Sequence, residues 1–246
     1  MNPMVDLAII ILTRNEQANL PFALASVTGW ARQVFVFDSF STDGTERIAR
    51  EAGAAFVQNT FRDYSQQRND ALRLLPIQSG WTMFLDADEQ VDDELKREIE
   101  VAVVRPEFDG YYVRHKMLWR GKWIRRGYFG TWRLPIFRTG KGRTDDHGVN
   151  EHQIVDGRVG FIRALLIHED HNGLERWLLK HIDYAKREAL RARAEQRPGI
   201  ASLLGSQSDR KNWVRWAVWQ RLPVPLRASA LFGKRMRSEE RRVGKE

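Results

Sequence analysis

The chain has 246 residues, of which 42% are hydrophobic and 11% aromatic, so it can bury one sizeable core and is not a disordered polymer. Lysine and arginine total 40 against 32 acidic residues, but residues 190–246 hold 14 of the basic and only five of the acidic side chains. The positive excess therefore belongs to the C-terminal segment. The absence of cysteine excludes disulfides, thiolate metal sites and a cysteine nucleophile.

The sequence predicts a cytoplasmic protein. A chain without cysteine suits a reducing compartment. The first apolar run, residues 7–12, is short and follows Asp6, so it lacks the basic start and the length of a signal peptide. No stretch approaches the roughly eighteen apolar residues of a membrane span. We expect any membrane contact to be peripheral, on the inner face of the cytoplasmic membrane.

Strand-like and helical patterns alternate over the first hundred residues. Such alternation with short links predicts a mostly parallel central sheet with helices on both faces, an α/β fold. The expected strands are residues 7–12, 33–38, 54–58 and 81–88, and the expected helices are residues 16–27, 45–53, 64–75 and 92–103.

Three of these strands end in polar residues. Ligands bind beyond the carboxyl ends of the strands in open α/β sheets, so a shared ligand site is expected there. For the second strand a simpler alternative is open, in which Thr42 and Asp43 only cap the following helix. The polar groups are Thr13, Arg14, Asn15 and Glu16 after the first strand, Asp38, Ser39, Ser41, Thr42 and Asp43 after the second, and Asp86 and Asp88 after the fourth.

The fourth strand, in "WTMFLDADEQ", runs directly into clustered carboxylates. If the strand continues to Asp88, Asp86 and Asp88 point the same way, about 6.5 to 7 Å apart. Carboxylate oxygens suit Mg²⁺ or Mn²⁺, which complete their shells with water and substrate phosphates. The pattern thus favours a divalent cation that neutralises a diphosphate.

The character of the chain changes after residue 110. Residues 111–143 contain ten Lys or Arg, no acid and eight aromatic residues, with the glycine spacing of short antiparallel strands and loops. An amphipathic helix is expected at about residues 174–195. The face that carries its apolar residues would be formed by Leu174, Trp177, Leu178, His181, Ile182 and Ala185.

Two other functions compete with a nucleotide-dependent enzyme of this kind. The basic and aromatic residues 111–143 are typical of nucleic-acid binding, although residues 1–189 are nearly neutral overall. A metal-dependent nucleotidyltransferase would also use paired carboxylates. It would carry a glycine-rich phosphate loop with a lysine after the first strand, and "LTRNEQ" has neither residue.

Four motifs in order identify a resemblance: "ILTRNEQANLPFALASV", "VFVFDSFSTDGTERIAREAGA", "QQRNDAL" and "WTMFLDADEQVDDEL". Together they resemble family 2 glycosyltransferases of the GT-A fold, and in particular bacterial lipopolysaccharide-core β-glycosyltransferases. The resemblance covers about residues 5–195. It implies an inverting enzyme that transfers a hexose from a nucleotide diphosphate sugar, with UDP expected, to a saccharide or lipid-linked acceptor in lipopolysaccharide or cell-envelope polysaccharide biosynthesis.

The resemblance also implies roles for individual residues. Asp86 and Asp88 match the DxD element, with Asp88 the expected direct ligand of Mg²⁺ or Mn²⁺. His168 is expected to contact the metal or the diphosphate, with a structural role as the alternative. The residues expected around the nucleotide are Thr13, Asn15, Glu16, Asp38, Ser39, Asp43, Gln67, Arg68 and Asp86, with Asp38 near the base or ribose, and Arg133 and Arg138 are expected to hold the diphosphate.

The general base is expected in "DDHGVNEHQIV", residues 145–155. A carboxylate near its ordinary pKa can take the proton of an acceptor hydroxyl as the new bond forms. We predict that Glu151 is this base, and Asp145 and Asp146 are the alternatives.

The expected organisation is a GT-A domain over residues 1–197, divided into a nucleotide-sugar half, 1–110, and an irregular, antiparallel acceptor half, 111–197. Residues 198–236 form a basic, aromatic segment with C-terminal helices, suited either to a membrane interface or to ordinary helix packing. Residues 237–246 are expected to be a non-native tail, with the natural chain continuing differently beyond about residue 236.

Overall fold

The computed structural model describes residues 4–125, 132–145 and 152–194, and the single positions 213, 223, 225 and 226. The chain divides into two compact units, Met1–Trp177 and Leu178–Glu246. Helix α5 (Gly173–Ala194) begins in the first unit and continues in the second. The predictions for residues 198–236 and 237–246 fall almost entirely outside the described residues.

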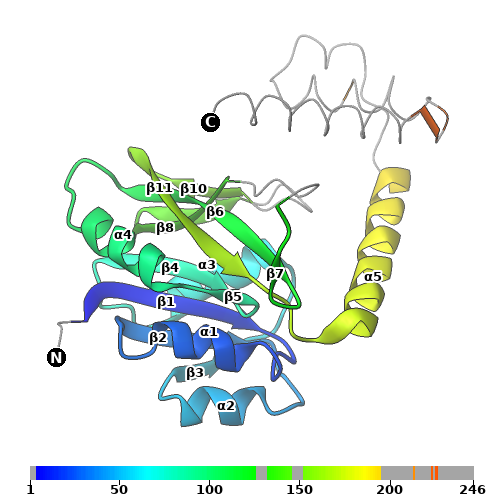
Figure 1. Cartoon of the computed structure of the whole chain (residues 1–246), viewed down its shortest axis with the longest axis horizontal. Helices are drawn as coiled ribbons and strands as arrows, with labels where there is room; N and C mark the ends of the chain where they lie inside the picture. Colours follow the sequence, from blue (N-terminus) through cyan, green and yellow to red (C-terminus); the bar gives the residue numbers. More distant parts are fainter. Residues whose placement is uncertain are drawn as a thin grey trace. The chain divides into compact units, whose positions relative to one another are not determined.

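The first half of the first unit alternates strands and helices, as the sequence predicts (Figure 1). Its strands are β1 (Val5–Thr13), β2 (Ala31–Asp38), β3 (Ala55–Gln58), β4 (Trp81–Asp86) and β5 (Glu89–Gln90). Its helices are α1 (Leu20–Val27), α2 (Thr45–Glu51), α3 (Tyr64–Leu74) and α4 (Asp93–Val103).

In the second half of this unit, the described residues before α5 form strands and their connections. These strands are β6 (Gly110–Trp119), β7 (Lys122–Trp123), β8 (Trp132–Arg138), β9 (Gly142–Asp145), β10 (His152–Val155) and β11 (Val159–His168). Strands β9 and β10 pair only with each other, as an antiparallel ribbon.

One sheet joins both halves, in the order β3-β2-β1-β4-β8-β6-β11-β5, with β7 paired to β6. Strands β3, β2, β1 and β4 are parallel. Strand β8 is antiparallel to both β4 and β6, and β11 is parallel to β6. The sheet is therefore mostly parallel, with β8 reversed near its centre and the two short strands β5 and β7 antiparallel to β11 and β6.

Helices cover both faces of the parallel part, because alternate residues of each buried strand face opposite ways. Ile9 and Ile11 of β1 face the layer of α1 and α4, where Leu24 and Ile99 are fully buried. Ile10, on the other face, packs in the cluster that contains residues of α3. Each such side chain stabilises the fold by about 1.5 to 3 kcal/mol through burial.

Beyond β6 the edge of the sheet is formed by β11, which pairs with β5 only at its last two residues, Ile167 and His168. The carboxylate of Glu98, from α4, accepts hydrogen bonds from the main-chain N–H groups of Arg163 at 2.8 Å and Ala164 at 3.2 Å. A side chain of α4 thus satisfies two main-chain donors on this edge.

The expected fourth strand is shorter than predicted. Strand β4 ends at Asp86, Ala87 and Asp88 form a turn, and the chain resumes as β5 at Glu89. The Glu89 carboxylate accepts a hydrogen bond from the Asp86 N–H at 2.8 Å, which closes this turn. The prediction that the strand continues to Asp88 is therefore wrong, and Asp86 and Asp88 have different neighbours.

The predicted amphipathic helix is present as α5, one residue displaced from the expected range. Its apolar face is not buried in the way the pattern predicts, because Leu174, Leu178 and Ile182 are about half exposed. In the part of the chain that the structure describes, no helix combines the length and the apolar character needed to span a membrane.

Candidate active site

The polar ends of β1, β2 and β4 lie at one edge of the sheet, as the sequence predicts. In the parallel register Thr13 lies beside Asp38, and Leu12 lies beside Asp86. The carboxyl ends of three neighbouring strands meet there, in the position where open α/β sheets bind ligands.

Asp38 is fully buried and organises the loop that follows β2. Its carboxylate accepts hydrogen bonds from Thr13 Oγ1 at 2.8 Å, from the Ser41 N–H at 2.8 Å and from Ser41 Oγ at 2.5 Å. A buried carboxylate needs such donors because it has lost its water. Asp38 therefore uses its carboxylate oxygens on protein groups, and its predicted contact with the base or ribose stays a prediction.

Asn15 links the loops that follow β1 and β2. It adopts a left-handed backbone conformation, with φ of 57°, which asparagine tolerates better than most residues. Its N–H donates to Ser41 Oγ at 2.7 Å, and its side-chain oxygen accepts from the Thr42 N–H at 2.8 Å. The two loops are thus fixed against each other at the sheet edge.

Asp43 lies just before α2, whose N-cap residue is Gly44, and it contacts the first residue of the helix. Its carboxylate accepts from the Thr45 N–H at 3.0 Å, where α2 begins, and from the Gln17 N–H at 3.2 Å. Burial raises the pKa of Asp43, but the hydrogen bonds from Thr45 and Gln17 outweigh this effect and lower it. Its predicted nucleotide contact stays a prediction.

Glu16 joins the loop after β1 to the segment around the start of α5. Its carboxylate accepts hydrogen bonds from Asn19 Nδ2 at 2.8 Å and Asn172 Nδ2 at 3.4 Å, and lies 4.0 Å from Arg176 Nη2. Residues far apart in the sequence are therefore held together beside the expected nucleotide.

Ser39 and Gln67 form a buried polar pair at the same edge. Gln67 Nε2 donates to Ser39 Oγ at 3.0 Å, and both residues are almost fully buried. The other side-chain atom of Gln67, Oε1, is buried without a hydrogen-bond partner. An unpaired buried acceptor costs about 1 to 3 kcal/mol, so this atom is a natural place for a donor group of a ligand.

Asp86 lies between two arginines. Arg68 Nη2 donates to one oxygen at 2.9 Å and Arg133 Nη1 donates to the other at 2.9 Å. Burial raises the pKa of Asp86, but the charges of Arg133 and Arg68 outweigh it and hold this pKa well below its usual range. Asp86, Arg68 and Arg133, which the sequence predicts at one site, are brought together.

Asp88 and His168 meet on the other side of the turn. His168 Nε2 lies 3.6 Å from Asp88 Oδ2, and the Asp88 carbonyl oxygen accepts from the Glu169 N–H at 2.8 Å. Burial lowers the pKa of His168, but its interaction with Glu89 and the charges of Asp88 and Asp86 raise it to about 9. The structure therefore places His168 beside the carboxylates, as the sequence predicts.

The sequence analysis missed two residues of this site, Glu89 and His115. Glu89 Oε1 lies 2.6 Å from His115 Nε2 and 3.2 Å from Arg133 Nη1, and Glu89 is only 2% exposed. Burial and the charge of Asp86 raise the pKa of Glu89, but contacts with His115, His168 and Arg133 outweigh them and lower it to about 2. Glu89 directly follows the DxD pattern in the sequence, which could have indicated it, whereas no sequence pattern indicated His115.

The prediction for Arg138 is wrong in position. Arg138 pairs in the sheet with Trp81, the first residue of β4, whereas Asp86 is the last residue of that strand. Its guanidinium lies 4.7 Å from the Trp81 ring centroid and 3.5 Å from Asp109. Because β8 is antiparallel to β4, its two arginines lie toward opposite edges of the sheet, and only Arg133 reaches the site.

The expected base, Glu151, and its alternative Asp146 lie outside the described residues. Asp145 is described at the end of β9, where its carbonyl oxygen accepts from Ser65 Oγ of α3 at 3.3 Å. The neighbouring Thr144 exchanges two main-chain hydrogen bonds with the Asn69 side chain, at 2.8 and 2.9 Å. The ribbon that leads into the predicted base segment is thus tied to α3.

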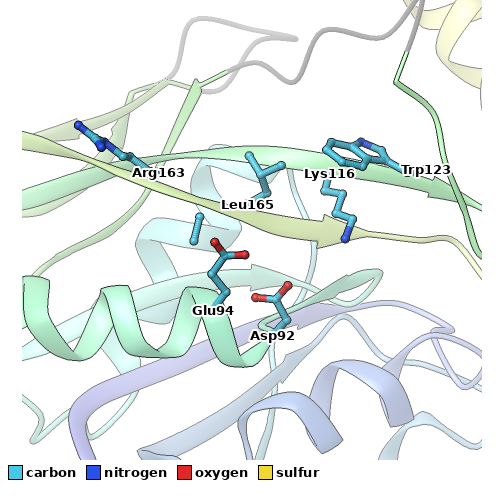
Figure 2. A pocket seen from close by; sticks show the side chains of 7 residues that line it. Asp92, Glu94, Lys116, Trp123, Arg163 and Leu165 are labelled. Atoms are coloured by element: carbon cyan, nitrogen blue, oxygen red, sulfur yellow. The ribbon is translucent and has the colours of Figure 1, made fainter. Parts of the chain in front are cut away.

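A separate pocket of about 230 Å³ lies where α4 begins, against β11 and the β6–β7 hairpin (Figure 2). Figure 2 shows Asp92 and Glu94 on one side, and the side chains of β6, β7 and β11 on the other. Lys116 of this lining pairs in the sheet with Ile167, which precedes His168. The remaining lining residues are Trp123, Arg163, Ala164 and Leu165.

The residues at the sheet edge fit a divalent cation. Asp88 and His168 offer a carboxylate oxygen and an imidazole nitrogen from neighbouring segments, a donor set that suits Mn²⁺-type ions. Asp86 is less suited to direct contact with a metal, because both of its carboxylate oxygens already accept hydrogen bonds from arginines. Asp88 is accordingly the better placed of the two aspartates for direct contact with a metal.

Comparisons with known proteins agree with this picture. Residues 8–166 match the family model described as glycosyl transferase family 2. The chain is 31% identical over 121 residues to an uncharacterized glycosyltransferase of Rickettsia typhi, covering 48% of this chain and 41% of the relative. It is 34% identical over 108 residues to one of Rickettsia felis, covering 44% and 38%. The chain thus spans about two fifths of the length of these relatives.

Among solved structures, the fold is similar to that of S. aureus TarS, residues 1–349, in complex with UDP-GlcNAc. The TM-score is 0.51 at 16% identity, covering 68% of this chain and 59% of that one. This likeness supports the GT-A assignment of the fold. Because the family model spans well over half of the sequence, the chain belongs to glycosyltransferase family 2.

Proposed function

We propose that the chain is an inverting hexosyltransferase that uses a UDP-hexose and Mg²⁺ or Mn²⁺. One observation carries this proposal. The carboxyl ends of β1, β2 and β4 lie at the same edge of the sheet as the Asp88–His168 pair and the two arginines that hold Asp86. The choice of UDP is supported by the ligand of the TarS structure, which is UDP-GlcNAc.

Each group at the edge then has a task. Asp88 and His168 would hold the cation, which would neutralise the charge that develops on the leaving diphosphate. Arg133, about a third exposed, is available for the diphosphate as well as for Asp86. The side-chain oxygen of Gln67, Oε1, has no hydrogen-bond partner beside Ser39 and would accept a hydrogen bond from the nucleoside.

The reaction we propose is a single displacement. Glu151, or in its place Asp145 or Asp146, takes the proton of the acceptor hydroxyl as its oxygen attacks the anomeric carbon. The bond from that carbon to the diphosphate oxygen breaks on the opposite side, and the electron pair leaves with the nucleotide. The configuration of the anomeric carbon is inverted because attack and departure occur on opposite faces.

The acceptor is proposed to be a saccharide or a lipid-linked saccharide of lipopolysaccharide or the cell envelope, reached by a cytoplasmic enzyme at the inner membrane face. We place its sugar at the pocket of Figure 2, where an indole ring, two carboxylates and two cations surround a space suited to one polar ring. Residues 1–110 would then serve the donor and residues 111–197 the acceptor, with residues 198–236 near the membrane.

Nucleic-acid binding by residues 111–143 is less well supported. Much of their positive charge is paired within the fold, since Arg138 and Lys141 contact Asp109, and Arg143 contacts Asp156. Membership of the glycosyltransferase family also favours glycosyl transfer over a nucleotidyltransferase.

Calorimetry with UDP, with and without Mn²⁺, tests the proposal. We expect UDP to bind at least about tenfold more tightly with Mn²⁺, because the cation bridges the carboxylates and the diphosphate. Absence of any Mn²⁺-dependent UDP binding would contradict it. Oligonucleotide binding that weakens steeply with salt would instead support the nucleic-acid alternative.

A further inference from the structure

Glu89, the buried acid that follows the DxD turn, is the point where four segments of the site meet. Its Oε2 accepts from the Asp86 N–H at 2.8 Å, and its Oε1 lies 2.6 Å from His115 Nε2 and 3.2 Å from Arg133 Nη1. The same Oε1 lies 3.9 Å from His168 Nδ1. One carboxylate therefore contacts the DxD turn, β6, β8 and the end of β11.

This arrangement has two chemical interpretations. The ligand atoms of Glu89, His115 and His168 all lie within 4.8 Å of one another, and two histidines with one carboxylate are a common metal-binding set. Alternatively, Glu89 and His115 are a hydrogen-bonded pair that does not touch the metal and only positions the groups that do.

The contacts of Glu89 favour the second interpretation. Both of its oxygens already accept hydrogen bonds, and one of them faces the guanidinium of Arg133, which a metal ion at the same oxygen would have to displace. The separation of 2.6 Å from His115 Nε2 is that of a strong hydrogen bond. Glu89 and His115 are also deeply buried, with side chains 2% and 6% exposed.

The contacts of the two ring nitrogens of His168 indicate that the Glu89–His115 pair positions this ring. Nε2 faces Asp88, the aspartate that is better placed for a metal, at 3.6 Å. Nδ1 is buried without a hydrogen-bond partner, and Glu89 is the carboxylate on that side. A histidine that binds a metal through one nitrogen usually directs its other N–H toward a carboxylate, which fixes the orientation of the ring.

We propose that Glu89 and His115 form a buried positioning pair, in which His115 fixes Glu89 and Glu89 orients His168 and the DxD turn for cation binding. Strand pairing supports this geometry, because His168 lies opposite Glu89 in the β5–β11 pair and Leu166 lies opposite His115 in the β6–β11 pair. The inference rests on the proposed function, because it assigns a metal contact to His168.

The two interpretations make opposite predictions for His115→Arg. An arginine keeps a hydrogen-bond donor for Glu89 but cannot ligate a metal ion. If His115 belongs to a positioning pair, His115→Arg should bind Mn²⁺–UDP within about threefold of the parent protein. If His115 is a metal ligand, the Mn²⁺-dependent gain in UDP affinity should disappear, and the proposal would be overturned.

Glu89→Gln removes the charge while keeping the shape. We expect the Mn²⁺-dependent part of UDP binding to weaken by about 10- to 100-fold, with little change in UDP affinity without metal. The matched control is Glu98→Gln, which alters a carboxylate that also contacts β11 but lies away from the site. An equal loss in both variants, or no loss in Glu89→Gln, would refute the positioning role.

Nuclear magnetic resonance of ¹⁵N-labelled histidines tests the pair without any ligand. We expect Glu89→Gln to shift the ring nitrogens of His168, and His115→Arg to leave them close to those of the parent protein. If the parent protein fails to bind Mn²⁺–UDP, the proposed function is wrong, and these spectra still decide whether Glu89 orients His168. Unchanged His168 signals in Glu89→Gln would overturn the pair itself.

Discussion

Asp86 and Asp88 are two residues apart and have different partners. Asp86 is enclosed by two guanidinium groups, whereas Asp88 faces an imidazole across a turn. The first arrangement is an ion-pair network that holds β4 to α3 and β8. The second is a carboxylate and an imidazole nitrogen 3.6 Å apart, so the two aspartates are expected to respond differently to substitution.

At the residue scale, the prediction for the general base concerns Glu151. Glu151→Gln keeps the size of the side chain but cannot accept a proton, so turnover should fall by about two to four orders of magnitude. Donor binding should be unaffected, because the base acts on the acceptor. Steady-state kinetics with calorimetry of Mn²⁺–UDP measure both. Near-normal turnover in Glu151→Gln, with loss in Asp145→Asn or Asp146→Asn, would assign the base to that pair.

Asp88→Asn provides the contrast. It should weaken Mn²⁺–UDP binding as well as turnover, because a proposed ligand of the metal is lost. An Asp88→Asn protein that keeps full donor affinity would remove Asp88 from the cation site.

The sequence identified some of these residues and missed others for physical reasons. Asp86 and Asp88 were predicted because they stand in a local motif at the end of a strand, and Arg68 because it stands in the local motif "QQRN" of α3. His115 lies in the interior of β6, and its partner Glu89 is 26 residues away on β5, so they come together because β6 and β5 both pair with β11. Arg133 and Arg138 look equivalent in "WRLPIFR", and only the direction of β8 separates them.

At the scale of elements, the β6–β7 hairpin projects aromatic side chains from the second half of the first unit. Trp123 is 42% exposed, and the Lys116 amine lies 5.3 Å from the centroid of its ring. Both residues line the pocket in which we place the acceptor sugar (Figure 2).

Trp123→Ala should therefore raise the KM for a saccharide acceptor by about tenfold, because a contact surface for the sugar ring is lost. The affinity for Mn²⁺–UDP should not change. Trp132→Ala is a suitable control, since Trp132 is similarly exposed but does not line the pocket. An equal rise in KM in both variants, or an effect on donor binding alone, would remove the pocket from the acceptor site.

The alternation of strands and helices made the first half of the chain predictable element by element. Buried runs such as β1 and β2 have few alternatives, because both of their faces are apolar. The second half was less predictable. Strands β6 and β11 are parallel although about forty residues separate them, and nothing in their local sequence encodes that partnership.

At the scale of the whole molecule, the carboxylate and histidine cluster makes stability depend on pH. The pKa of His168 is raised from 6.5 to about 9, so its stabilising effect is complete below about pH 6.5 and is lost as the pH rises toward 9. The metal-free protein should thus lose stability over this window, by at most about 1.4 kcal/mol per pH unit from this group.

Urea unfolding in the presence of a chelator, at pH 6, 7.5 and 9, measures this dependence. His168→Gln should have lower stability at pH 6 and a flatter profile up to pH 9. Parallel profiles for the parent protein and His168→Gln would show that His168 is not the group responsible.

The position of Glu98 has a consequence for how copies of the molecule meet. The outer side of β11 offers main-chain hydrogen-bonding groups along most of its length, and such an edge is a template on which a strand of another molecule can add. Glu98 occupies two of the N–H groups with a negative charge. An incoming strand would have to expel that carboxylate and set its own carbonyl oxygens beside it. Glu98 is therefore expected to make the addition of a further strand at this part of β11 less favourable.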